Sequence, residues 1–325
     1  NNELIGGIPA ELGDLNKLEV LRLYNNQLTG CYNENLMSLC NQLYDTDNTN
    51  TSISNGNNFD APWEVFCITG MCVRYAPCRQ SDSLALVVLK DSTDGANWIN
   101  TWNLTQPIDT WYGISLNENG CVIWIDIAEN NLFGSIPSEI GNLSNLLSFN
   151  ISNTQISSIP SEIGSLNNLI GLGISHTQIN SIPAQLENLS SLEDLWMNNI
   201  QLPQGNIPSQ IFNISSLKTL NLQSNGFIGN IPPEISNLTN LEVLDVRGNS
   251  FVGEIPASFA NLTKLKHLTF SSNNFEGDVL DIIVNFPNLE SFHASSNQFT
   301  GNIPSPIVNL TQLKEISLQN NRFSG

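Results

Sequence analysis

The sequence predicts an α/β repeat solenoid, in which short parallel strands stack side by side over one shared core. The main observation is a 24-residue period, because an asparagine closes each of five consecutive repeats. These residues are Asn225, Asn249, Asn273, Asn297 and Asn321, and the same frame continues upstream at Asn130, Thr154, Thr177 and Ile200. A fixed period of this length is typical of stacked supersecondary units, since a single unit cannot bury its apolar face alone.

The first part of each repeat has the pattern of a short strand. Side chains along a strand point alternately to its two faces, so Leu244 and Val246 are expected in the core and their neighbours outside. The Asn that closes the strand can satisfy backbone groups of the turn that would otherwise be buried without partners. Ile200 cannot do this, so we expect either compensation from Asn198 or Asn199 or an irregular coil.

The second part of each repeat predicts an aromatic spine and a convex return. Five phenylalanines, each two residues after the closing Asn, are expected to stack inside the solenoid because aromatic rings bury a large area. They are Phe227, Phe251, Phe275, Phe299 and Phe323. A glycine two residues later allows a tight turn. The pair Ile255-Pro256 and its equivalents are extended before the proline, which can start a short helical segment.

The charge balance excludes two classes of partner. Among 325 residues 30 are acidic and 11 are basic, which gives a formal net charge of −19. Such a chain repels nucleic acid and anionic membranes. No stretch approaches the roughly 20 apolar residues of a membrane span. The repeats also hold no paired-carboxylate site, Cys–His couple or phosphate loop, so we expect no catalysis, cofactor or metal.

Breaks in the period divide the chain into four parts. They are the end of a first array (1–30), a cysteine-containing C-terminal cap and junction (31–77), an N-terminal cap with a helix and a tryptophan-rich segment (78–121), and a second array of about nine coils (122–325). The helix is expected at residues 82–91, with Ser81 or Asp82 as its N-cap. Both chain ends interrupt a repeat, so we expect a piece of a longer protein.

All the cysteines lie in the irregular section, at Cys31, Cys40, Cys67, Cys72, Cys78 and Cys121. An even number confined to one section suggests disulfide-stapled caps in an oxidising compartment, and therefore an extracellular or cell-surface protein. Many pairings are open. We favour Cys31 with Cys40, Cys67 with Cys72, and Cys78 with Cys121. A zinc site is the weaker alternative, because no histidine lies near these positions.

The motif L-x-x-L-x-L-x-x-N-x-L/F-x-G-x-I-P resembles the plant-type subclass of leucine-rich repeats. The segment from Leu84 to Gly134 is similar to the N-terminal cap of plant receptor ectodomains, in which a helix precedes a W-x-G-V motif and a cysteine. The run from Asp94 to Gly113 is closer to extracellular repeat proteins of Bacteroidetes-like bacteria. The resemblance implies a leucine-rich-repeat horseshoe or superhelix, with a concave parallel sheet and short 3-10 or helical convex segments.

The concave face of such a solenoid is its usual binding surface, and twelve outward side chains there are candidate ligand contacts. They are Trp124, Asp126, Glu129, Asn150, His176, Asp194, Trp196, Asn198, Asp245, Arg247, His267 and His293. Trp124 and Trp196 are the strongest candidates, because tryptophans exposed on a strand face are costly unless a partner covers them. For Trp124 the alternative is contact with the N-terminal cap.

Two other patterns carry less weight. His267 and His293 are expected on adjacent strands, but no third metal ligand accompanies them, so polar surface histidines are the simpler interpretation. Asn-x-Ser/Thr sequons recur in one phase of the repeat, and because the repeat consensus itself generates them, they do not establish a glycoprotein.

These features predict a secreted or cell-surface recognition or adhesion module. Its partner would be a protein or a glycan, and a polar or basic partner suits the negative charge best. The alternatives are a structural stalk that self-associates through open solenoid ends and the non-catalytic part of a larger enzyme. Ice binding is disfavoured because regular Ser/Thr rows do not persist.

Overall fold

The computed structural model describes residues 77–324, three short strands nearer the N-terminus, and the single positions Leu12 and Asp14. The three strands are β1 (Ile5–Gly6), β2 (Gln27–Gly30) and β3 (Asn58–Phe59), and they pair in parallel in that order. The remainder of the predicted units 1–30 and 31–77 lies outside the described residues, as do Cys31, Cys40, Cys67 and Cys72. Their domain boundaries and pairings stay predictions.

The segment predicted as an N-terminal cap precedes the regular array. Its elements are α3 (Pro77–Ser92), η3 (Gly95–Asn97), η4 (Ile108–Thr110) and β4 (Ile114–Leu116). Three tryptophans form its core, with Trp98 and Trp102 in edge-to-face contact at 4.8 Å and Trp102 stacked on Trp111 at 5.2 Å. Each indole N–H donates to a backbone carbonyl oxygen, so these polar groups are buried without an unpaired donor.

Helix α3 begins earlier than the predicted N-cap, at Pro77, because proline is favoured in the first helical turn. Asp82 therefore lies inside the helix and has another task. Asp82 is only 1% exposed, and its carboxylate accepts a hydrogen bond of 2.8 Å from the backbone N–H of Val122. Since Val122 is the first residue of strand β5, this bond ties the cap helix to the start of the array.

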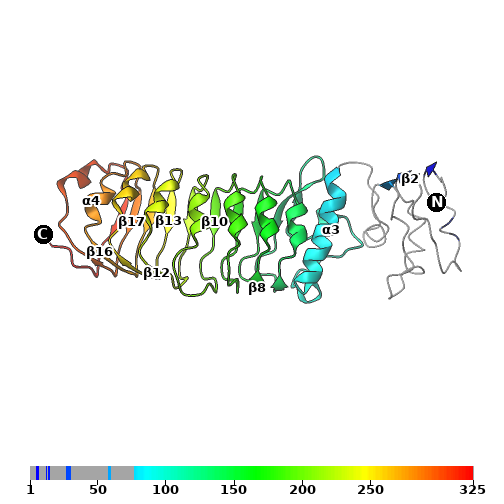
Figure 1. Cartoon of the computed structure of the whole chain (residues 1–325), viewed down its shortest axis with the longest axis horizontal. Helices are drawn as coiled ribbons and strands as arrows, with labels where there is room; N and C mark the ends of the chain where they lie inside the picture. The colour runs from blue at the N-terminus through cyan, green and yellow to red at the C-terminus, as the bar shows by residue number, and fades with distance from the viewer. Residues whose placement is uncertain are drawn as a thin grey trace.

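The array forms one ten-stranded sheet (Figure 1). After β4, which pairs antiparallel with β5, all neighbouring strands are parallel and in continuous register. The parallel strands are β5 (Val122–Asp126), β7 (Ser148–Asn150), β9 (Gly171–Gly173), β10 (Asp194–Trp196), β11 (Thr219–Asn221), β13 (Val243–Asp245), β15 (His267–Thr269), β17 (Ser291–His293) and β19 (Glu315–Ser317). This confirms the predicted solenoid with a parallel sheet.

Most coils return through a short second strand and a short helical segment, whereas the coils of β9 and β10 have the helical segment alone. The second strands form two further parallel sheets, β6 (Phe133–Ser135) with β8 (Gln155–Ser158), and β12 (Ile228–Gly229), β14 (Ser250–Gly253), β16 (Asn274–Gly277) and β18 (Gln298–Phe299). The helical segments are η5 (Ser138–Asn142), η6 (Ser161–Ser165), η7 (Ala184–Asn188), η8 (Ser209–Asn213), η9 (Pro233–Asn237), η10 (Ala257–Asn261), α4 (Leu280–Ile283) and η11 (Ser305–Asn309). They lie along one side of the elongated stack (Figure 1).

The predicted phenylalanine spine is confirmed. Successive rings from Phe227 to Phe323 stack with centroid distances of 6.0, 5.7, 5.9 and 6.4 Å. The first four of these side chains are buried, which agrees with a role in the shared core. Offset stacking of aromatic rings contributes attraction in addition to the area that they remove from water.

The asparagine that closes each strand bridges two coils. The amide oxygen of Asn249 accepts from the backbone N–H of Asn225 and of Phe227, each at 3.0 Å. Its amide nitrogen donates to the carbonyl oxygens of Leu222, in the preceding coil, and Val246, both at 2.9 Å. One side chain therefore satisfies four buried backbone groups.

The coil of Ile200 is compensated in a way that the sequence did not suggest. Asn198 and Asn199 do not fill the missing role. Instead Asn225, one repeat later, donates to the carbonyl oxygen of Met197 at 2.9 Å and accepts from the N–H of Ile200 at 2.9 Å. Because each Asn already reaches back to the preceding coil, one apolar substitution in the series is tolerated.

The contribution of Asp82 to stability can be tested by replacing it and measuring unfolding at two pH values. Burial raises the pKa of the Asp82 carboxyl from 3.8 to about 6, against the opposing hydrogen bonds from Val122 and Ser81. Because the folded pKa is the higher one, the stability that this group contributes is greatest below about pH 4 and is lost as the pH rises to about 6. Asp82→Asn retains an acceptor for Val122 and has no charge to bury. We expect its free energy of unfolding to be higher by on the order of 1–3 kcal/mol near neutral pH.

The difference between Asp82→Asn and the wild type should disappear near about pH 4, where the wild-type carboxyl is protonated. Urea unfolding followed by circular dichroism at both pH values measures it. The control is Asp91→Asn, which removes an exposed carboxylate from the same helix. An Asp82→Asn variant that is no more stable than the wild type at neutral pH would contradict this account.

Candidate functional site

Two tryptophans stand apart from the buried ones in the cap. Trp124 on β5 and Trp196 on β10 are 48% and 39% exposed, and both point away from the core on the outer sheet face, defined here as the solvent side of the ten-stranded sheet. Neither indole N–H has a hydrogen-bond acceptor among residues 81–324. Exposed aromatic surface of this size, fixed on a rigid strand, is typical of a contact surface.

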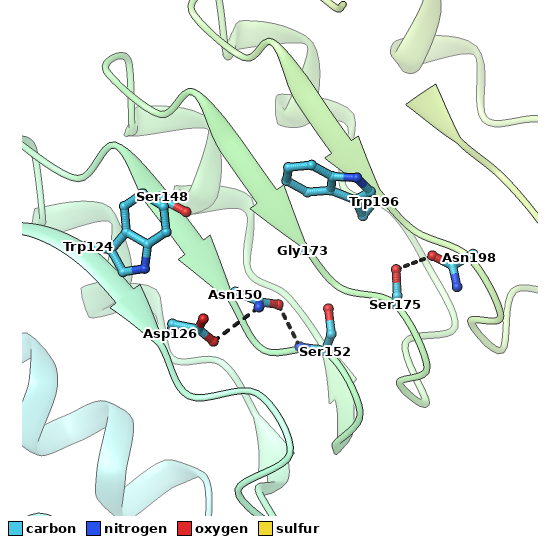
Figure 2. Close-up of a pocket in the computed structure, with 9 residues that line it drawn as sticks. All are labelled: Trp124, Asp126, Ser148, Asn150, Ser152, Gly173, Ser175, Trp196 and Asn198. Atoms are coloured by element: carbon cyan, nitrogen blue, oxygen red, sulfur yellow. Dashed lines mark hydrogen bonds between the residues drawn. The ribbon is translucent and has the colours of Figure 1, made fainter. Parts of the chain in front are cut away.

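The two indoles border a hollow of about 380 Å³, which we call the Trp pocket (Figure 2). Its lining residues are Trp124, Asp126, Ser148, Asn150, Ser152, Gly173, Ser175, Trp196 and Asn198. They come from four neighbouring strands, β5, β7, β9 and β10, and from the turns that follow them. The volume lies within the range of about 300–1,000 Å³ that is usual for ligand sites.

Glycines in strand β9 create the hollow. Gly171 and Gly173 occupy outward positions, where the neighbouring strands carry Ser148, Asn150 and Trp196. A Cβ atom on Gly173 would lie 2.5 Å from the amide oxygen of Asn150, so any side chain at this position would force Asn150 to shift. A Cβ atom on Gly171 would touch the ring of Trp196 at 3.5 Å, so that ring lies over strand β9.

Hydrogen bonds hold the polar side chains of the pocket in place (Figure 2). Asn150 donates to the Oδ1 atom of Asp126 at 3.1 Å, and its own amide oxygen accepts from the N–H of Ser152 at 3.1 Å. On the opposite side, the hydroxyl of Ser175 donates to the amide oxygen of Asn198. These groups are fixed before any ligand arrives.

Several groups in the pocket keep free bonding capacity. The Oδ1 atom of Asp126 accepts from Asn150 and from the N–H of Ala128, whereas its Oδ2 atom has no donor within residues 81–324. The hydroxyls of Ser148 and Ser152 donate to no group in that same range. The surface offered to a ligand therefore consists mainly of two indole faces, two hydroxyls and one carboxylate oxygen.

The part of the array around the pocket is uniformly acidic. Residues 122–212 contain seven Asp and Glu residues and no Lys or Arg. The first cation beyond them, Lys218, is paired with Glu193 at 2.7 Å. Later coils carry Lys266–Glu242 and Lys314–Glu290 pairs at 2.6 Å. The coils that contain the pocket therefore carry net negative charge, with no basic residue to offset it.

The structure brings five of the twelve predicted contact residues together in the pocket: Trp124, Asp126, Asn150, Trp196 and Asn198. The others are divided between its edge and the distant coils. His176 lies at the edge, with its Nε2 atom 3.1 Å from the amide nitrogen of Asn198. Glu129 and Asp194 do not line the pocket, although they stand on the same strands or turns.

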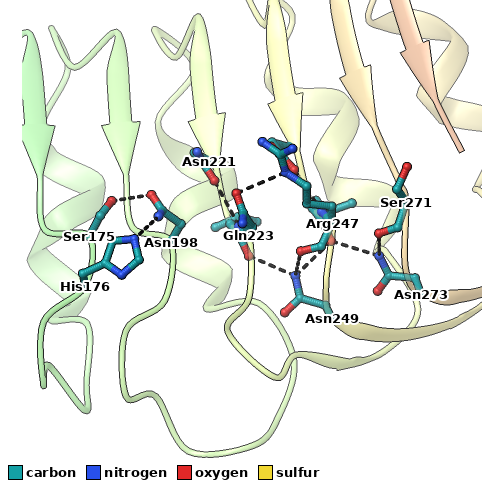
Figure 3. Close-up of polar contacts among 12 residues, drawn as sticks. Ser175, His176, Asn198, Asn221, Gln223, Arg247, Asn249, Ser271 and Asn273 are labelled. Carbon is teal, nitrogen blue, oxygen red and sulfur yellow. Dashed lines mark hydrogen bonds and ion pairs between the residues drawn. The ribbon is translucent and has the colours of Figure 1, made fainter. Parts of the chain in front are cut away.

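The remaining predicted residues form separate surface contacts. Arg247 pairs with Asp245 at 2.7 Å and donates to Gln223 at 3.1 Å (Figure 3). His267 bonds Ser291 at 2.9 Å and His293 lies 3.8 Å from Glu315, on the neighbouring strands β15 and β17. Within residues 81–324 no three His, Cys, Asp or Glu side chains are grouped as metal ligands.

The twelve predicted contacts do not include four lining residues, Ser148, Ser152, Gly173 and Ser175. Gly173 carried a usable signal, since glycine at two outward positions of one strand leaves a gap beside Trp196. Ser152 and Ser175 stand in the turns, beyond the alternating pattern on which the prediction relied.

Two further features concern the surroundings of the site. Cys121 is disulfide-bonded, and the side chain of its partner lies outside the described residues, so the proposed pairing with Cys78 stays a prediction. No helix in the described part of the chain has the length and apolar character needed to cross a bilayer.

This geometry defines the class of protein: a repeat solenoid with a preformed pocket on its outer sheet face. Two stretches, residues 126–226 and 201–324, match the family described as leucine-rich repeat region. Together they cover more than half of the chain, so the protein belongs to the leucine-rich repeat family.

Known proteins with similar sequence or structure include plant receptors and a bacterial repeat protein. MDIS1-interacting receptor like kinase 1 of Arabidopsis thaliana is 40% identical over 72 residues, which are 22% of this chain and 7% of that protein. The Arabidopsis HAESA ectodomain with an N-terminally extended IDA peptide hormone has a TM-score of 0.71 and 30% identity, over 77% of this chain and 43% of that one. A Leptospira interrogans leucine-rich repeat protein has a TM-score of 0.58 and 23% identity, over 99% of this chain and 71% of that one. At this level of identity the similarity supports a shared fold only.

The chain spans less than a tenth of the length of the receptor kinase and less than half of the HAESA ectodomain. The repeat array is therefore the part that these proteins share. The predicted resemblance to plant receptor ectodomains agrees with these matches, whereas the resemblance to Bacteroidetes-like proteins stays a prediction.

The glycine floor of the pocket can be tested by a pair of substitutions in one strand. Gly173→Ala drives a methyl group into Asn150, so we expect it to break the Asn150–Asp126 hydrogen bond and to destabilise the fold by about 1–3 kcal/mol. Gly171→Ala meets its neighbours at ordinary contact distance and should change stability by less than about 0.5 kcal/mol. Urea unfolding of the two variants measures the difference. Equal stabilities would show that the pocket floor is looser than described.

Proposed function

We propose that this chain is a non-catalytic recognition module that binds a peptide or protein partner on the outer sheet face, with the Trp pocket as its anchor site. The observation that carries the proposal is the pair of exposed indoles, which border one preformed hollow from opposite sides. Tryptophans set in a pocket at the centre of a surface are the side chains that most often dominate binding energy.

The rigidity of the site supports a binding role. Continuous parallel pairing fixes the four strands of the pocket, and internal hydrogen bonds fix Asn150, Ser175 and Asn198. A ligand would therefore not lose affinity to the ordering of a loop. Nothing in this arrangement resembles the nucleophile, base and oxyanion donors of a catalytic site.

The comparisons favour a peptide or protein over other partners. The HAESA ectodomain, which shares the array, is described in complex with a peptide hormone. By analogy we place this protein at the cell surface or outside the cell, and the disulfide at Cys121 agrees with an oxidising compartment. A glycan is the second candidate, because sugar rings also stack on exposed indoles.

Selection from a random peptide display library tests the proposal directly. We expect peptides selected on the wild-type protein to lose at least about tenfold in affinity on the double variant Trp124→Ala, Trp196→Ala, because both anchors are removed. Both side chains are exposed, so the variant should fold normally, and circular dichroism verifies this.

The matched control is Phe133→Ala, which removes an exposed aromatic ring from strand β6, outside the ten-stranded sheet. Selected peptides should bind this variant like the wild type. If the double tryptophan variant retained full affinity for every selected peptide, the outer sheet face would not be the binding surface. If no peptide bound while an oligosaccharide array gave binding that required the tryptophans, the partner class would be a glycan.

A further inference from the structure

We propose that the Trp pocket accepts the guanidinium group of an arginine side chain from the partner. This inference rests on the proposed function and states which chemical group the pocket recognises. It follows from three properties of the described residues: two free aromatic faces, one free carboxylate oxygen and a surrounding surface without cations.

The indole rings provide the first element. Trp124 and Trp196 rise from strands on opposite sides of the pocket, and the ring of Trp196 lies over the glycine strand between them. The π-face of an indole attracts cations more strongly than that of any other side chain, and arginine is its commonest partner in proteins. A planar guanidinium can also stack on the ring, which an ammonium group cannot do.

Asp126 provides the second element. One of its oxygens is held by Asn150 and by the N–H of Ala128, so the carboxylate cannot rotate freely. The other oxygen has no donor within residues 81–324, and the residue belongs to the pocket lining. A fixed carboxylate with one free oxygen next to aromatic surface suits a guanidinium, whose N–H groups donate charge-assisted hydrogen bonds in the plane of the group.

The third element is the charge of the neighbourhood. Residues 122–212 hold seven carboxylates and no Lys or Arg, so no cation from these coils is available to fill the pocket. Lys218, the next one along the chain, is already paired with Glu193. A cationic ligand gains attraction from this field, whereas an anionic ligand would be repelled.

The internal hydrogen bonds favour arginine over a sugar. Recognition of a sugar needs several polar side chains with free donors and acceptors facing its hydroxyl groups. Here Asn150, Ser175 and Asn198 are bonded to their neighbours and offer little to a ligand. The capacity that remains consists of the two indoles with their N–H groups, the hydroxyls of Ser148 and Ser152, and one carboxylate oxygen. Asp126 is the one charged residue among the nine that line the pocket, and its charge favours a cation.

Two blocked hexapeptides of alternating glycine and arginine or citrulline test the inference. Citrulline has nearly the shape of arginine but a neutral urea group. Isothermal titration at about 150 mM salt, where diffuse attraction is screened, measures both affinities. We expect the arginine peptide to bind at least about tenfold more tightly. Trp124→Ala, Trp196→Ala and Asp126→Asn should each weaken it by about threefold to thirtyfold and leave the citrulline peptide almost unchanged.

The control is Glu139→Gln on η5, which removes a partly exposed negative charge outside the pocket lining. It should leave the affinity for arginine unchanged. The inference is overturned if arginine and citrulline peptides bind alike, or if Glu139→Gln weakens arginine binding as much as Asp126→Asn does. Display-selected peptides that require the tryptophans but contain no arginine would overturn this inference alone. If the selected peptides bound equally well without the two tryptophans, that result would contradict the proposed function as well.

Discussion

The buried amide of the repeating asparagine is the interaction on which the rest of the array depends. A turn that enters the core leaves backbone N–H and C=O groups away from water, and each costs about 1–3 kcal/mol if it stays unpaired. In Asn249 one side chain satisfies four of them, one in its own coil and three in the coil before. Figure 3 shows the hydrogen bonds that its amide nitrogen donates. Because the amide spans two coils, it also fixes their register. The strands of the sheet are aligned so that outward side chains from different repeats form rows.

The candidate site arises where the repeat pattern places no constraint. Inward positions remain apolar, and the closing position holds a hydrogen-bonding residue in every coil of the array except that of Ile200, whereas outward positions of the strands are free to vary. In β9 both outward positions are glycine, and in β5 and β10 one is tryptophan. The regular scaffold therefore converts local differences in side-chain size into a hollow with defined walls. Because the same coils are acidic, the hollow favours a positively charged ligand.

Much of the fold could be predicted from the sequence because the period is strict. The solenoid, the inward leucines and the phenylalanine spine all follow from spacing, and Trp124 and Trp196 were expected on the outward face. Other features depend on packing between coils that spacing does not reveal. The compensation of Ile200 comes from Asn225 in the next repeat, and Asp82 lies inside a helix rather than at its start. The pocket floor was missed because glycine is informative only when the neighbouring ring is known to lie over it.

The most direct test of the account is the ¹⁵N–¹H spectrum of the tryptophan indoles during titration with a display-selected peptide. In the free protein, the indole N–H groups of Trp98, Trp102 and Trp111 donate to backbone carbonyls, whereas those of Trp124 and Trp196 have no acceptor within residues 81–324. The account predicts that the signals of Trp124 and Trp196 shift with the peptide and those of the three cap tryptophans do not. Binding without any change at Trp124 and Trp196 would contradict it.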